Sequence, residues 1–115
     1  MAKTPVKGTK AASSSAAARL DEGQVEAALR GATEWSELGD TIQRTFQFRS
    51  FVESMAFVDA VAGVAESDQH HPDILIRYNK VTLTLSTHDS GGITQKDFDA
   101  ASKYDARYAT LMVKA

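Results

Sequence analysis

The histidines are the residues of this sequence best suited to chemistry. The 115-residue chain has three of them, adjacent at His70 and His71 and single at His88. Histidine exchanges protons readily near neutral pH, so such a group suits general acid and base catalysis. Glu66 stands one helical turn before His70, where its carboxylate could orient that imidazole. The pattern therefore predicts proton-transfer chemistry at these four residues.

Two other interpretations of the histidines are compatible with the sequence. A His-His-Pro triplet is a weak signal by itself and also occurs as an exposed, inactive pair in a loop. Three histidines and a carboxylate are also a donor set for zinc, although adjacent residues rarely point at one ion. The chain contains no cysteine, which excludes thiolate metal sites, disulfides and cysteine nucleophiles. It also lacks the common phosphate-loop, nucleophilic-serine and zinc-protease motifs.

Hydrophobic periodicity predicts the elements that must hold these residues. Helices are expected over residues 20–31, from 51 to just before Pro72, and over 94–108, each opened by a capping pair: Asp21 with Gln24, Ser50 with Glu53, and Thr94 with Asp97. Strands are expected over residues 35–38, 41–49, 73–78 and 80–88. Strands joined by short turns predict a single α+β domain in the order helix-strand-strand-helix-strand-strand-helix. Its four-stranded antiparallel sheet would be covered by helices on one face.

The helix that begins at residue 51 is apolar on more than one side. One face carries Phe51, Met55, Val58 and Ala62, and three valines widen it: Val52, Val61 and Val64. A helix this apolar must be covered twice, and a small domain offers one cover only. We therefore expect a homodimer or homotetramer that forms through this helix.

The first 19 residues differ in composition from the rest. They contain four basic and no acidic side chains and are rich in alanine and serine. This composition predicts a disordered tail at 1–19 and a domain at 20–115. No apolar stretch approaches the ~20 residues of a membrane helix, and a net charge of −2 argues against general nucleic-acid binding. We expect a cytoplasmic protein, with the nucleus or an organelle as alternatives.

The spacing of the polar residues is more specific than any one of them. It resembles the signature of the pterin-4a-carbinolamine dehydratases, the dimerisation cofactor family, and the resemblance extends over residues 20–107. The residues that carry it are Glu66, His70-His71-Pro72, Tyr78, His88 and Asp97, with Trp35, Arg44-x-Phe46-x-Phe48, Phe51 and Gly92-Ile93-Thr94 outside them.

The resemblance implies an activity and a role for each residue. The family dehydrates 4a-hydroxytetrahydrobiopterin to the quinonoid dihydropterin, which recycles the cofactor of aromatic amino acid hydroxylases without a metal or organic cofactor. By resemblance, His70 and His88 are the acid/base pair, and Glu66 holds His70. Substrate binding falls to His71 and Asp97, and structural support to Pro72 and Tyr78. Without the resemblance, Asp97 is a helix cap, Asp73 a solvated residue, and Tyr78 and Phe98 core residues.

The resemblance also leaves a non-enzymatic role open. Some members of the family stabilise dimers of a transcription factor, and relatives without the full histidine set act in assembly. The complete histidine set in this chain favours the enzyme.

Overall fold

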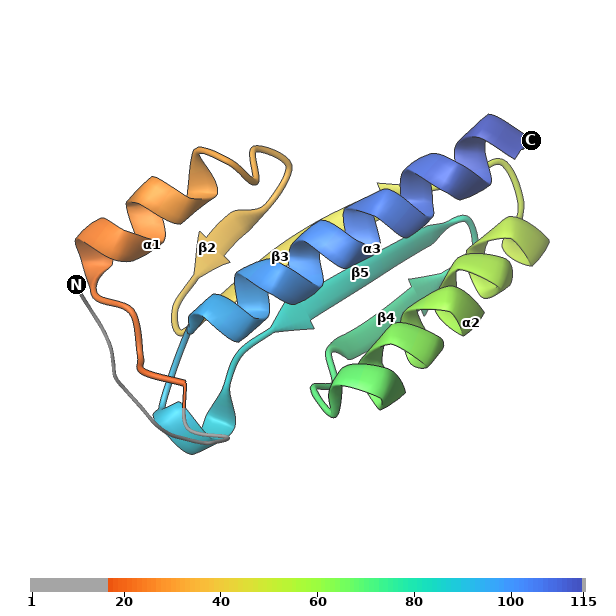
Figure 1. Ribbon diagram of the computed structural model, residues 1–115. Coiled ribbons are helices and arrows are strands. Elements are labelled where there is room, and N and C mark those ends of the chain that lie inside the picture. The colour runs from red at the N-terminus through yellow and green to blue at the C-terminus, as the bar shows by residue number, and fades with distance from the viewer. Residues whose placement is uncertain (1–16, 115) are drawn as a thin grey trace.

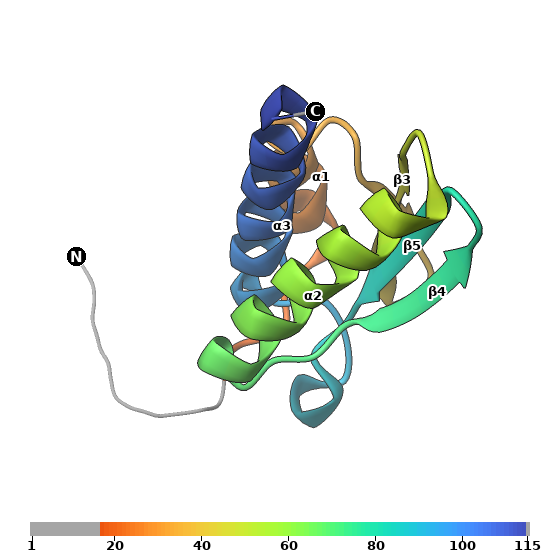
Figure 2. The same ribbon diagram turned by 90° about the vertical axis from the view of Figure 1, so that its right-hand side faces the viewer.

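A computed structural model describes residues 17–114 and shows one antiparallel sheet with helices on one face (Figures 1 and 2). The sheet order is β2-β3-β5-β4. Its strands are β2 (Ser36–Leu38), β3 (Thr41–Gln47), β4 (Asp73–Arg77) and β5 (Lys80–Leu85). The helices are α1 (Glu22–Leu29), α2 (Phe51–Asp68) and α3 (Gln95–Lys114), with a 3-10 turn η2 (His88–Ser90) before α3. The predicted α+β class, element order and antiparallel sheet are confirmed.

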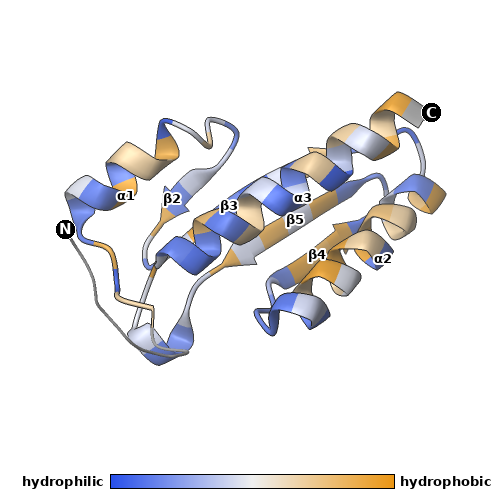
Figure 3. Ribbon diagram, viewed as in Figure 1, coloured by the Kyte–Doolittle hydropathy of each residue, from blue (hydrophilic) through white to orange (hydrophobic). Residues whose placement is uncertain are grey.

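Alternation along the two central strands builds the core. Ile42 and Phe46 of β3 and Val81, Leu83 and Leu85 of β5 all point to the helical side and are buried. The opposite side of these strands is polar, and two threonine hydroxyls meet across it. Figure 3 shows the resulting contrast between the apolar strands and the mixed surface of α3. Period-two burial therefore fixes which face of the sheet receives the helices.

Asp105 ties α3 to the strands. Its carboxylate accepts hydrogen bonds from Trp35 Nε1 at 2.9 Å and from Arg44 Nη1 at 2.7 Å. The Arg44 guanidinium also lies 4.3 Å from the ring centre of Phe46 and 5.1 Å from that of Tyr108. These directional contacts set the position of α3 along the sheet, and with it the position of Asp97 in the first turn of this helix.

The helix starts follow the predicted caps, with one difference. The reciprocal box of Asp21 and Gln24 opens α1 as expected. Ser50 Oγ likewise accepts the Glu53 N–H at the start of α2. The Glu53 carboxylate, however, accepts the backbone N–H and guanidinium of Arg49, not the Ser50 N–H. The hydrogen bond from the Arg49 side chain lowers the pKa of Glu53. An arginine at that position offers the carboxylate a charged donor in addition to a backbone one.

Helix α2 presents two different apolar sides. Ser54, Phe57 and Val61 lead the buried side, which packs on the sheet and α3. Of the predicted stripe, Phe51 is 48% exposed, as is its neighbour Val52 at 77%, whereas Val58 packs against the core. Figure 3 shows α2 as largely hydrophobic along its length. The outer side of α2 is therefore uncovered in one protomer.

The last helix is longer than periodicity predicts. It continues past Tyr108 to Lys114, because Leu111 and Met112 still pack against the core. By contrast, α2 ends where expected, at Asp68, before Pro72. Proline disfavours helical backbone at the residue before it, so it marks a helix end in the sequence. A helix end set by tertiary packing has no such local marker.

The chain is docked on the domain earlier than predicted. The Ser90 hydroxyl donates to the Ala17 carbonyl, the Leu20 N–H donates to the Ile93 carbonyl at 2.8 Å, and Arg19 pairs with Thr94 as an isolated bridge. The prediction of a disordered tail is therefore wrong for residues 17–19, because backbone pairing with the loop before α3 orders them. Its remainder, residues 1–16, lies outside the described residues.

Tyr104 leads to a stability prediction. Its ring is fully buried, and within residues 17–114 its hydroxyl has no hydrogen-bond partner. A buried unpaired hydroxyl costs about 1–3 kcal/mol, so Tyr104→Phe should raise the free energy of unfolding in urea by roughly 1 kcal/mol. Tyr108→Phe is the matched control, because the Tyr108 hydroxyl donates to the Gln47 carbonyl at 2.8 Å; this change should destabilise. A loss of stability in Tyr104→Phe would contradict the prediction.

The same residue predicts a pH dependence. Burial raises the pKa of Tyr104 from 10.0 to about 12. Above pH 10 the unfolded chain releases this proton while the folded protein still holds it, so stability falls as pH rises toward 12. This contribution should vanish in Tyr104→Phe, measured by urea unfolding across that range.

Candidate functional site

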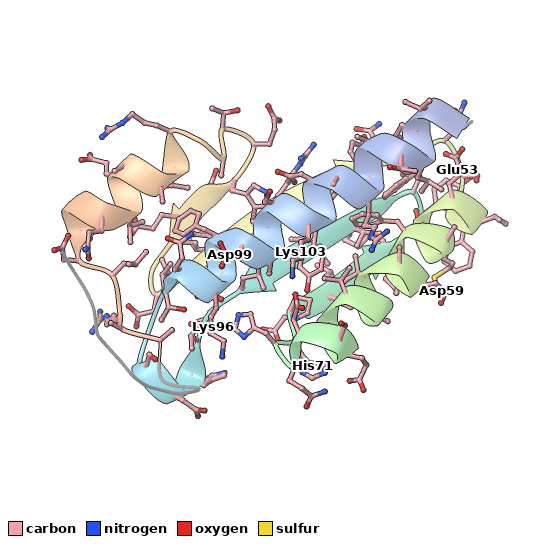
Figure 4. The ribbon with its side chains drawn as sticks, in the orientation of Figure 1. Glu53, Asp59, His71, Lys96, Asp99 and Lys103 are labelled. Atoms are coloured by element: carbon pink, nitrogen blue, oxygen red, sulfur yellow. The ribbon has the colours of Figure 1, made fainter. Side chains whose placement is uncertain are left out.

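A tight helix end sets the positions of the two adjacent histidines. Gln69 follows α2 in the left-handed conformation, with φ of 51°, and the His70 N–H donates back to the Ala65 carbonyl. Pro72 then favours extended backbone at His71, so the chain runs directly into β4. Adjacent side chains of extended chain point to opposite sides. His70 accordingly faces α3, and His71 faces the end of the sheet near the lower end of α2 (Figure 4).

His70 is held by Asp97, not by Glu66 as predicted. Its Nε2 lies 2.6 Å from Asp97 Oδ1, and the Asp97 side chain is fully buried. Helical spacing between Glu66 and His70 does not apply, because the left-handed residue Gln69 breaks the helix between them. The predicted direct contact of Asp97 with substrate is also unsupported by this burial. Asp97 is instead placed to orient His70.

A chain of hydroxyls completes the surroundings of Asp97. Its Oδ2 accepts the Thr94 N–H and the Thr87 hydroxyl, both at 2.9 Å. Since Thr87 donates there, the Thr94 hydroxyl 2.8 Å away must donate to Thr87, while Thr94 accepts the Lys96 N–H. Asp97 thus receives only donors, as an ionised carboxylate requires. With Asp97 ionised, His70 Nε2 carries a proton, and Nδ1 is the ring nitrogen left to accept one.

Glu66 holds His71 instead. Its Oε2 lies 2.6 Å from His71 Nε2, and both side chains are more than half exposed. The reversal of the chain after Gln69 brings His71 back over the last turn of α2. Each of the two adjacent histidines therefore has its own carboxylate, one buried and one at the surface.

His88 begins the turn η2 and does not end a strand as predicted. The strand β5 stops at Leu85. The Thr87 N–H donates to the Gly92 carbonyl at 2.9 Å, which closes a small loop around His88. Gly91 makes this loop possible because it adopts φ of 77°, which side chains disfavour. His88 is exposed on the loop, while the neighbouring Thr87 points inward to Asp97.

His71 and His88 line one cavity of about 340 Å³ at the end of the sheet. The other lining residues are polar or glycine: Asp40, Thr41, Asp73, Thr84, Ser86, Gly91 and Gly92. His70 lines a second hollow, of about 220 Å³, with Asp68, Lys96 and Lys103. Figure 4 shows the two lysines along α3. The structure therefore brings His71 and His88 to one cavity, and places His70, paired with its buried aspartate, in a separate hollow on the α3 side.

Tyr78 is neither a core residue nor a support of this cavity. It sits in the β4–β5 turn with φ of 52° and is 68% exposed. That turn is at the opposite end of β4 from Asp73, so Tyr78 lies a strand length away from the histidines. Phe98, in contrast, is buried in the core as expected. Pro72 follows the extended backbone at His71, and its supporting role at the site stays a prediction.

Several site residues were missed by the sequence reasoning. In the sequence, Thr84, Ser86 and His88 are the polar residues that alternate with apolar ones, and this alternation was the available signal. Asp40, Asp73 and Thr87 had no comparable signal, because only the fold places them at the cavity or behind it. In residues 17–114 no three His, Asp or Glu side chains could hold one metal ion. No helix in that range is long and apolar enough to cross a membrane.

Comparisons with known proteins point to one family. The sequence model of the pterin 4 alpha carbinolamine dehydratase family matches residues 18–107. Relatives provisionally named pterin-4-alpha-carbinolamine dehydratase include one from Picosynechococcus sp., 49% identical over 77% of this chain and 97% of the relative. Another, from Roseiflexus sp., is 52% identical over 77% of this chain and 96% of the relative.

Two solved structures also resemble this one. A transcriptional coactivator/pterin dehydratase from Brucella melitensis has a TM-score of 0.76 at 35% identity, covering 78% of this chain and 98% of that one. A pterin dehydratase-like protein described as a RuBisCO assembly factor of the alpha-carboxysome has a TM-score of 0.57 at 28% identity. That match covers 65% of this chain and 89% of the other.

Proposed function

Because this chain belongs to the pterin 4 alpha carbinolamine dehydratase family, we propose that it dehydrates 4a-hydroxytetrahydrobiopterin to quinonoid dihydrobiopterin. The product would be reduced again to the tetrahydropterin that an aromatic amino acid hydroxylase consumes. One observation carries the proposal within the family. His71 and His88 line a single polar cavity, and His70, the neighbour of His71 in the chain, is held by a buried carboxylate.

The reaction needs one acid and one base near the pterin ring. Carbon 4a bears the leaving hydroxyl and is bonded to nitrogen 5, whose lone pair can expel that oxygen. Hydroxide leaves poorly, so an acid must protonate it to water. A base must remove the proton from nitrogen 5 as the carbon–nitrogen double bond forms. Each proton transfer by a positioned side chain contributes typically ~10²–10⁴ in rate.

We assign the two proton transfers to His70 and His88. His70 has an orienting carboxylate that fixes its tautomer, the usual arrangement of a histidine that exchanges protons. His88 is exposed on the loop at the cavity. His71, held by Glu66 on the cavity wall, would bind and orient the pterin. No metal or organic cofactor is needed, since nitrogen 5 supplies the electrons and imidazoles move the protons.

An assay of dehydration tests this proposal. Purified protein should accelerate the loss of water from 4a-hydroxytetrahydropterin above its spontaneous rate, with and without a metal chelator. The substrate can be generated in place by a hydroxylase that uses a tetrahydropterin. An unchanged rate with folded protein would contradict the enzyme, and loss of activity with the chelator would contradict the metal-free mechanism.

We also propose that the protein self-associates through the outer side of α2. Phe51 and Val52 are exposed there, in an otherwise ordered helix, and exposed apolar patches of this kind mark contact surfaces. Val52→Lys should shift light-scattering mass from a dimer or tetramer toward 12.4 kDa. Val113→Lys is the matched control, because Val113 is also exposed but lies near the end of α3. A wild-type protein that is monomeric at micromolar concentration would contradict this prediction.

A non-catalytic role in assembly or as a transcriptional cofactor is the second candidate. The outer side of α2 favours it, because that surface could bind another protein as well as a second copy. A structural neighbour is described as an assembly factor and another as a transcriptional coactivator. Folded, self-associating protein without dehydratase activity would favour this second candidate. For either role we propose a cytoplasmic location.

A further inference from the structure

We propose that Asp73 makes the cavity selective for pterins with an uncharged side chain at carbon 6 and against pterins with an anionic one. The inference rests on the proposed pterin site. It concerns a specificity-determining residue, not a proton-transfer group.

The cavity walls carry two carboxylates and no lysine or arginine. The carboxylates are those of Asp40 and Asp73. Glu66 lies just outside, on His71, and Asp89 follows His88 on the loop. A ligand anion would therefore find no lysine or arginine on the wall to pair with. Desolvating an unpaired anion beside like charges is unfavourable.

The two wall carboxylates differ in their neighbours. Asp40 Oδ1 lies 3.3 Å from the Arg19 guanidinium, which also packs against Gly92 of the cavity wall. Within the described part of the chain, the Asp73 carboxylate makes no ion pair or side-chain hydrogen bond. Asp73 is thus the wall carboxylate without a cationic partner, and because it is exposed its charge is screened by solvent and salt alone.

The rest of the cavity suits a neutral, hydroxylated ligand. Thr41, Thr84 and Ser86 supply hydroxyls, and Thr84 lies directly opposite Asp73 in the strand register. A volume of about 340 Å³ is near the lower end of ligand pockets, at ~300–1,000 Å³. A like unit charge about 5–10 Å from the exposed Asp73 carboxylate weakens affinity by about two- to fourfold in water.

Binding of two pterins that differ only in side-chain charge tests the proposal. We would titrate the protein with 6-hydroxymethylpterin and 6-carboxypterin and follow pterin fluorescence. Wild-type protein should bind the neutral ligand about two- to fourfold more tightly. Asp73→Asn should bring the two affinities together by improving 6-carboxypterin, while 6-hydroxymethylpterin is unaffected. Added salt should reduce the wild-type preference, because screening weakens the repulsion.

Two further variants test whether the preference depends on charge at the cavity wall. Asp59→Asn removes the same charge from the exposed side of α2, away from His71 (Figure 4), and should keep the preference. Arg19→Gln leaves Asp40 uncompensated and should increase the preference. Equal wild-type affinities, or an Asp73→Asn variant that weakens both ligands alike, would overturn the proposal.

The assay separates this inference from the proposed reaction. Selective binding without dehydration would contradict the reaction and leave the inference standing. Dehydration of neutral and anionic substrates with equal kcat/KM would support the reaction and contradict the inference. Protein that binds neither pterin would contradict both.

Discussion

Replacing His70 with alanine should lower kcat by about 10²- to 10⁴-fold and change KM much less. The proposed role of His70 is a proton transfer, which lowers the barrier without adding to ground-state binding. Its ring is anchored at 2.6 Å by a fully buried aspartate, so the imidazole is held in one orientation before substrate arrives. An interaction made in the transition state alone appears in kcat and not in KM.

His71→Ala should show the opposite profile, with a raised KM and a smaller change in kcat. His71 lines the cavity and is paired with Glu66 at the surface. Glu66→Gln should therefore resemble His71→Ala in direction, although the sequence alone would predict that it resembles His70→Ala. Steady-state kinetics on the three variants decides between these assignments. Identical profiles for the two histidine variants would refute the division of roles.

Asp97→Asn should lower kcat by at least about 10-fold and as much as about 10⁴-fold, with the fold intact. The amide oxygen can replace Oδ2 and accept from Thr87 and Thr94. The amide nitrogen then faces His70 Nε2 and must donate to it. His70 is thereby forced to carry its proton on Nδ1, the nitrogen that the native arrangement leaves for proton exchange.

Three measurements separate this effect from a structural one. Thermal unfolding of Asp97→Asn should show a folded protein. Its kcat should be reduced, with a pH–rate profile different from that of the wild type, since the proton-exchanging nitrogen of His70 has changed. Asp59→Asn is the matched control, because Asp59 is exposed on α2 and lines neither cavity that contains a histidine; its kinetics should be unchanged. A native kcat in Asp97→Asn would show that His70 does not need this partner.

Local physics made much of the fold predictable. Period-two alternation along 80–87 identified the buried face of β5, because every second strand residue points to the same side. Asp21 and Ser50 marked helix starts, since their side chains accept orphan N–H groups regardless of what packs nearby. Pro72 bounded α2 for an equally local reason. The spacing of the histidines also carried the family resemblance.

Tertiary structure alone decided which groups meet. Helical spacing in the sequence predicted that Glu66 pairs with His70. One left-handed residue, Gln69, ends the helix between them, and Glu66 hydrogen-bonds to His71 instead. His70 then pairs with Asp97, which is distant in sequence and is brought there by the position of α3 on the sheet. Sequence periodicity holds only within an element, so contacts across a helix end or between elements depend on the packing of the whole chain.

The cavity is the clearest example. His71 follows a helix, His88 sits on a loop after β5, and Asp40 belongs to the turn between β2 and β3. The sequence determined that these residue types exist and that the strands alternate. Only strand pairing in the order β2-β3-β5-β4 brings these residues to the same end of the sheet. Long-range backbone hydrogen bonds set that order, and no short window of sequence contains both partners of such a bond.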